Sequence, residues 1–154
     1  MVYLCMLGKR PSLYVVEDEP VLYENLVLQL RLKGFDVKGG GIGADDVYDK
    51  MRNDKERVDV ILADLDIMCA DTVKYSYYIK ALQSDVKFVF FTVHEKLEER
   101  VRRAVEDLKA VVVKRPFEIE DMIEVVRRVA ESSSPVIEDV IKGGDEDGEK
   151  GNSV

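Results

Sequence analysis

The chain has 154 residues, of which 46% are hydrophobic, and its 31 acidic residues outnumber 23 basic ones for a formal net charge of -8. This length suits one well-buried domain and is short for two. The acidic balance argues against a nucleic-acid surface, which needs concentrated lysine and arginine, and no apolar run approaches the length of a membrane span.

Short apolar runs alternate along the chain with segments of helical periodicity. The expected strands are residues 13–16, 35–37, 58–63, 88–91 and 110–113. The expected helices are residues 20–33, 44–53, 72–83, 96–108 and 119–131. This alternation predicts an α/β fold, a doubly wound parallel sheet with helices on both faces.

The composition changes after the last expected helix. From Ser132 onward the sequence is rich in serine and then in glycine, aspartate and glutamate, which predicts an acidic, disordered tail over residues 132–154 behind a folded domain of residues 1–131. An apolar patch, Val136 and Ile137 with Val140 and Ile141, leaves a helical docking element as an alternative. Cys5 and Cys69 lack metal-ligand spacing, so we expect reduced thiols in a soluble, cytoplasmic protein.

Acidic residues follow the first and the third expected strand. Glu17 and Asp18 come directly after residues 13–16, and Asp64 follows residues 58–63. Because parallel strands present their carboxyl ends at one edge of a sheet, Asp18 and Asp64 should face the same crevice. Two carboxylates there repel each other, and Mg²⁺, which binds carboxylates and carbonyls, would relieve that repulsion.

Polar side chains also end the fourth and fifth expected strands. Thr92 brings a hydroxyl group and Lys114 an ammonium group to the same crevice. Carboxylates, a hydroxyl and a lysine together suit phosphoryl transfer to a carboxylate.

Four motifs in this order resemble the receiver domain of two-component response regulators, the CheY-like superfamily. Residues 15–19 resemble its acidic signature, residues 64–68 its phosphoacceptor loop, Thr92 its switch hydroxyl, and Lys114 with Pro116 its lysine-proline pair. The resemblance covers residues 12–131. It implies a flavodoxin-like fold with a five-stranded sheet in the order 2-1-3-4-5 and five flanking helices.

The resemblance also implies roles around the metal. Asp64 would be the phosphoacceptor, the nucleophile that takes phosphate from the phosphohistidine of a sensor kinase. Asp18 and Asp64 would ligate Mg²⁺ directly, Glu17 through a water, and Asp66 through its backbone carbonyl.

Two further residues would contact the phosphoryl group. Thr92 would hydrogen-bond it and draw its loop inward, while Lys114 would pair with its oxygens. Arg115 stands between Lys114 and Pro116, and we favour Lys114 as the phosphate ligand because it ends the strand directly.

The function that follows is a stand-alone receiver in two-component signal transduction. Its partners would be a sensor histidine kinase or phosphotransfer protein and a downstream protein target, with no direct contact to nucleic acid or membrane. It would not be a conventional enzyme, although phosphoryl acceptance and autodephosphorylation would be intrinsic activities.

Three alternatives stay open. Met68 and Val93 depart from the residues usual in the family, which leaves a pseudo-receiver that binds proteins without phosphorylation. Glu17 with Asp64 and Asp66 also resembles the acidic pattern of a Toprim-like metal nuclease. The glycine run at residues 39–43 superficially resembles a dinucleotide-binding fingerprint, although a glycine-rich connection explains it.

Overall fold

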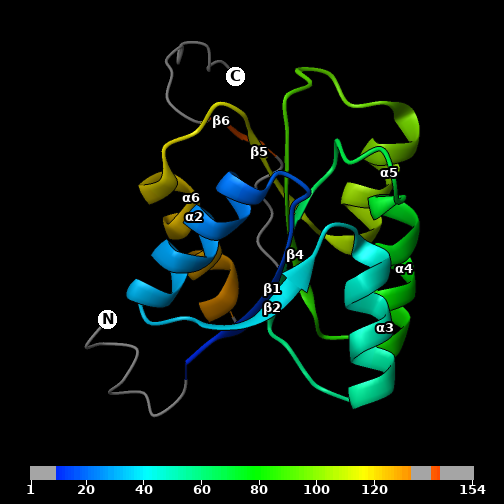
Figure 1. The fold of residues 1–154 in the computed structure, drawn as a ribbon. Coiled ribbons are helices and arrows are strands. Elements are labelled where there is room, and N and C mark those ends of the chain that lie inside the picture. Colours follow the sequence, from blue (N-terminus) through cyan, green and yellow to red (C-terminus); the bar gives the residue numbers. More distant parts are fainter. Residues whose placement is uncertain (1–9, 133–139, 143–154) are drawn as a thin grey trace.

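A computed structural model describes residues 10–132 and 140–142 of the chain. The elements, in chain order and labelled as in Figure 1, are β1 (Ser12–Val16), α2 (Pro20–Leu32), β2 (Asp36–Gly41), α3 (Ala44–Asp54), β3 (Val60–Asp64), α4 (Thr72–Leu82), β4 (Lys87–Thr92), α5 (Glu99–Leu108), β5 (Val111–Lys114), α6 (Ile119–Glu131) and β6 (Val140–Lys142). Among these residues, no helix is long and apolar enough to cross a bilayer.

The strands form one parallel sheet in the order β2-β1-β3-β4-β5-β6. Helices α2 and α6 cover one face, and α3, α4 and α5 cover the other (Figure 1). The predicted doubly wound sheet, its order 2-1-3-4-5 and its five flanking helices are therefore confirmed. The short strand β6 is an addition at the β5 edge.

The sheet lies between two hydrophobic layers, and alternate residues of each strand enter opposite layers. In β1, Leu13 and Val15 pack in the layer that includes α2 and α6, whereas Tyr14 and Val16 pack in the layer that includes α3, α4 and α5. A strand covered on both faces has no polar side, which is why these strands read as continuous apolar runs.

The second strand differs from its predicted position. It runs from Asp36 to Gly41 instead of residues 35–37, so Gly39 to Gly41 belong to the sheet. A Cβ atom at Gly40 would lie 1.8 Å from the Val15 carbonyl oxygen, and Gly39 has a φ of +127°. Glycine is therefore required where β2 passes β1. Because the run is a strand, it does not form the phosphate-binding loop of a dinucleotide site.

The predicted tail is only partly described. Val140–Lys142 form β6, with Val113 opposite Ile141 in parallel register, so the alternative of a helical docking element is wrong for these residues. Residues 133–139 and 143–154 lie outside the described part of the chain. The tail's predicted disorder is therefore not tested there.

Candidate phosphoacceptor site

Three carboxylates from the ends of β1 and β3 gather at the carboxyl edge of the sheet. One carboxylate oxygen from each of Glu17, Asp18 and Asp64 lies within 4.8 Å of the others. The cause is the strand pairing, because β1 and β3 are neighbours and Val16 stands opposite Ala63. The structure thus brings together the three side chains expected around a metal ion.

Two of these carboxyl groups are almost fully removed from solvent. Glu17 is 2% exposed and Asp64 is 3% exposed, whereas Asp18 is exposed. Burial raises the pKa of Glu17 to about 8, and the neighbouring Asp64 carboxyl group adds to the shift. Burial also raises the pKa of Asp64. Without a cation, the folded site therefore favours a proton over a second negative charge.

One buried carboxylate oxygen of the cluster lacks a hydrogen-bond donor in the described part of the chain and would be stabilised by a nearby cation. Glu17 Oε2 accepts a hydrogen bond of 2.8 Å from the Glu19 N–H, but the buried Oε1 has no hydrogen-bond partner among the described residues. A buried oxygen without a donor is costly unless a positive charge compensates it. Hard oxygen ligands, one of them reachable from solvent, form the donor set that Mg²⁺ prefers.

The phosphoacceptor candidate, Asp64, is held in a defined orientation. Its Oδ1 accepts a hydrogen bond of 2.8 Å from the Asp66 N–H, and its Oδ2 lies 3.5 Å from Arg115 Nη1. The Thr72 hydroxyl, at the start of α4, donates to the Asp64 carbonyl oxygen at 2.9 Å. Both side-chain oxygens of Asp64 therefore face groups that stabilise negative charge.

The two neighbouring cations at the end of β5 have different surroundings. The Lys114 ammonium donates to the carbonyl oxygens of Glu95, at 2.7 Å, and His94. Arg115 pairs with Asp64 and lies over the Phe91 ring, 5.7 Å from its centroid. Of the two candidates for the phosphate ligand, the structure brings Arg115 to Asp64 and attaches Lys114 to the loop after β4.

Arg115 is a second candidate beside Lys114, the residue favoured from the sequence. Lys114 ends the apolar run and was favoured for that reason, but Arg115 is the residue directly before Pro116, and the peptide bond between them is cis. The Arg115 N–H also donates to the Thr92 carbonyl oxygen at 2.8 Å, which ties it to the end of β4. The position of Arg115 directly before Pro116 was the signal in the sequence that could have marked it as a candidate phosphate ligand.

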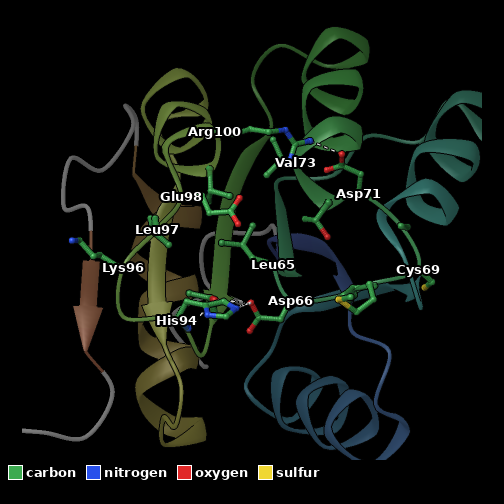
Figure 2. A pocket seen from close by; sticks show the side chains of 16 residues that line it. Leu65, Asp66, Cys69, Asp71, Val73, His94, Lys96, Leu97, Glu98 and Arg100 are labelled. Carbon is green, nitrogen blue, oxygen red and sulfur yellow. Dashed lines mark hydrogen bonds and ion pairs between the residues drawn. The ribbon is translucent and has the colours of Figure 1, made fainter.

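Thr92 is also brought to the site, where it contacts Asp66. The Thr92 hydroxyl donates to Asp66 Oδ1 at 2.7 Å, and the Val93 N–H donates to Asp66 Oδ2 at 2.8 Å. The imidazole Nε2 of His94 lies 3.6 Å from the same carboxylate, and Figure 2 shows the two side chains directed toward each other. The sequence predicted only a backbone role for Asp66, so this side-chain contact is an additional finding.

A cavity of about 540 Å³ opens beside these residues. Its walls come from the loop after β3, the start of α4, the loop after β4 and α5 (Figure 2). Asp66 and Thr92 line it, but the three clustered carboxylates do not. The cavity therefore opens beside the Thr92 hydroxyl and is separate from the carboxylate cluster.

Comparison with solved structures agrees with the fold. The chain resembles in fold a CheY-like receiver domain protein from Methanospirillum hungatei (16% identity, TM-score 0.69, 80% of this chain and 95% of that one). It also resembles the CheX–CheY complex with BeF₃ and Mg²⁺ from Borrelia burgdorferi (14%, 0.71, 83% and 95%) and the non-phosphorylated HemR receiver domain from Leptospira biflexa (21%, 0.67, 82% and 99%).

A search of curated proteins returned no significant match. The family model of the response regulator receiver domain, in contrast, matches residues 13–127, from β1 into α6. With the sheet order, the clustered carboxylates and this match in agreement, the chain belongs to the response regulator receiver domain family.

Proposed function

We propose that this receiver domain accepts a phosphoryl group on Asp64, in a Mg²⁺-dependent transfer from the phosphohistidine of a sensor histidine kinase or phosphotransfer protein. The observation that carries the proposal is the environment of Asp64. Its buried carboxylate lies beside Glu17 and Asp18 and 3.5 Å from the Arg115 guanidinium, which together supply metal ligands and a cation around one nucleophile.

The reaction follows from these surroundings. An Asp64 carboxylate oxygen attacks phosphorus, the bond from phosphorus to the donor nitrogen breaks, and the electron pair stays on that nitrogen. The product is an acyl phosphate, and attack by water restores the carboxylate and releases inorganic phosphate. The chain is thus a phosphoryl acceptor with autodephosphorylation as an intrinsic activity, and it does not turn over a separate substrate.

Mg²⁺ would be held directly by the carboxylates of Asp18 and Asp64, by the Glu17 carboxylate through a water, and by the Asp66 backbone carbonyl. The ion would supply positive charge to the phosphoryl oxygens during transfer. The unpartnered Glu17 Oε1 supports this assignment, as does the similar fold of a CheY solved with BeF₃ and Mg²⁺.

Thr92 and a basic side chain would hold the transferred group. The Thr92 hydroxyl lies at the end of β4, beside the end of β3 that carries Asp64. Arg115, rather than the Lys114 favoured from the sequence, would pair with the phosphoryl oxygens, because its Nη1 atom already lies 3.5 Å from Asp64 Oδ2. Lys114 would act on the same group indirectly, through the loop that it holds.

The signal would reach a downstream protein through changed contacts, without direct binding of nucleic acid or membrane. Stand-alone operation, the cytoplasmic location and the identities of the kinase and the target stay predictions. The family match removes the nuclease alternative and the dinucleotide-binding alternative. A pseudo-receiver remains the second candidate, because Met68 is 95% exposed in a loop where relatives usually carry proline.

Incubation with acetyl phosphate and Mg²⁺, followed by intact mass measurement, tests the proposal. We expect the gain of one phosphoryl group, its absence in Asp64→Asn, and no effect of Asp85→Asn, which changes an exposed acid outside the site. An unmodified wild-type protein under saturating donor would contradict the proposal and favour the pseudo-receiver.

A further inference from the structure

The side chain of Asp66 occupies two hydrogen-bond donors at the end of β4, beside the end of β3 that carries Asp64. Its Oδ1 accepts from the Thr92 hydroxyl at 2.7 Å and its Oδ2 accepts from the Val93 N–H at 2.8 Å. Each donor has one proton to offer, so neither can serve a second oxyanion while the contact lasts. Asp66 thus occupies two donors that an oxyanion on Asp64 could otherwise use.

Several contacts hold this arrangement in place. The Asp66 N–H donates to Asp64 Oδ1, so the backbone of Asp66 is fixed next to the phosphoacceptor. The loop that carries Val93 is fixed in turn by the Lys114 ammonium, which donates to the carbonyl oxygens of His94 and Glu95. The donors are therefore oriented before any ligand arrives, and the Asp66 carboxylate uses that orientation.

Hydrogen bonds to a carboxylate are stronger than those to a neutral acceptor. The Asp66 side chain is 19% exposed, so it is partly shielded from water but not locked in the core. It borders the cavity of about 540 Å³, which leaves room for the carboxylate to turn away from Thr92. The contact of Asp66 with Thr92 and Val93 can therefore compete with a phosphoryl group for these donors, and a phosphoryl group can also displace it.

We infer that Asp66 is a positioning residue that acts as an internal competitor: its carboxylate occupies the Thr92 hydroxyl and the Val93 N–H in the free protein and must leave before the phosphoryl group on Asp64 can bind them. The inference rests on the proposed function of Asp64. Breaking the Asp66 hydrogen bonds would add a free-energy cost to activation, although the Asp66 side chain takes no part in the transfer itself.

Beryllofluoride with Mg²⁺ is the probe, since it binds an aspartate carboxylate as a tetrahedral phosphoryl analogue and is not hydrolysed as an acyl phosphate is. Titration of the full chain gives its half-saturating concentration. We expect Asp66→Ala and the isosteric Asp66→Asn to lower that concentration roughly twofold to tenfold, the range expected when one net hydrogen bond is removed from the competing state.

Glu98→Gln is the matched control, because Glu98 lines the same cavity and makes no side-chain cap at α5. It should bind the probe as the wild type does. Unchanged or weakened binding in both Asp66 variants, with normal binding in the wild type, would overturn the inference and leave the proposed function intact. No binding in any of the proteins would overturn both.

The amide resonance of Val93 separates competition from a structural effect. In the free state we expect its proton shift to differ between wild type and Asp66→Ala, because only the wild type offers a carboxylate acceptor. In the bound state the two shifts should converge, because the same anion then accepts from Val93 in both proteins. A difference that persists after saturation would contradict displacement.

Discussion

Arg115 lies beside Asp64, with its Nη1 atom 3.5 Å from the Asp64 Oδ2 atom, and the guanidinium is supported by the face of the Phe91 ring. The adjacent Lys114 turns to the carbonyl oxygens after β4 instead. We therefore expect separate tasks for these two consecutive cations. Arg115 is placed to neutralise charge at the proposed phosphoacceptor, and Lys114 holds the loop after β4.

Substitution of each cation should distinguish these tasks. Arg115→Ala should raise the half-saturating acetyl phosphate concentration about tenfold or more, since it removes a charge-assisted contact. Arg115→Lys should restore part of the loss. Lys114→Ala should instead destabilise the protein by about 1 to 3 kcal/mol, because two carbonyl oxygens lose their donor, with a smaller effect on phosphorylation. Urea unfolding and intact mass measure the two effects, and the reverse pattern would contradict this division.

Magnesium should stabilise the folded protein. A ligand that binds only the folded state raises the unfolding free energy with its concentration, so millimolar Mg²⁺ should raise the melting temperature. The increase should disappear in Asp18→Ala, which removes the exposed ligand of the cluster. Asp45→Ala, in the first turn of α3 and outside the carboxylate cluster, should keep it. Equal shifts in both variants would show that the ion acts elsewhere.

The stability of the metal-free protein should fall as pH rises through the range set by Glu17. Its pKa is about 8 in the folded state and 4.5 in the unfolded reference. The folded state therefore binds more protons between these values, and the unfolding free energy decreases from pH 4.5 toward pH 8. Glu17→Gln, which cannot lose a proton, should flatten this dependence in urea unfolding with EDTA. If the unfolding free energy of Glu17→Gln fell with pH as steeply as that of the wild type, the raised pKa of Glu17 would be contradicted.

The sixth strand should protect the edge of the sheet. Removal of residues 133–154 eliminates β6, and backbone amide exchange in β5 should become faster because its edge loses a partner. A chain that ends after Lys142 keeps β6 and should retain the wild-type protection. Hydrogen exchange followed by mass spectrometry compares the three proteins. Equal protection in all of them would indicate that β6 does not stay paired in solution.

The parallel sheet and the clustered carboxylates could be predicted from the sequence, because both depend on patterns that run along the chain. Strands buried on both faces read as apolar runs, and Asp64 follows one of them directly. The sequence was insufficient for β2, where Gly40 is part of the strand because the backbone of Val15 leaves no room for a side chain. Such a close approach depends on the neighbouring strand and is not visible in local propensity.

Contacts between side chains could not be predicted from the sequence either. Arg100, Arg102 and Arg103 stand close together in the sequence, but each pairs with a carboxylate, so their positive charge is largely compensated. The contact of Asp66 with Thr92 joins residues 26 positions apart across two loops. Spacing alone could place both residues at one edge of the sheet but could not show that they bind each other.

Mapping of the phosphorylated residue shows whether Asp64 is the phosphoacceptor. After treatment with acetyl phosphate and Mg²⁺, borohydride reduction converts an acyl phosphate of aspartate to homoserine, which peptide mapping then locates. The account predicts homoserine at position 64 and at no other acid, including Asp18 and Asp66. Reduction at another aspartate, or none at saturating donor, would contradict it.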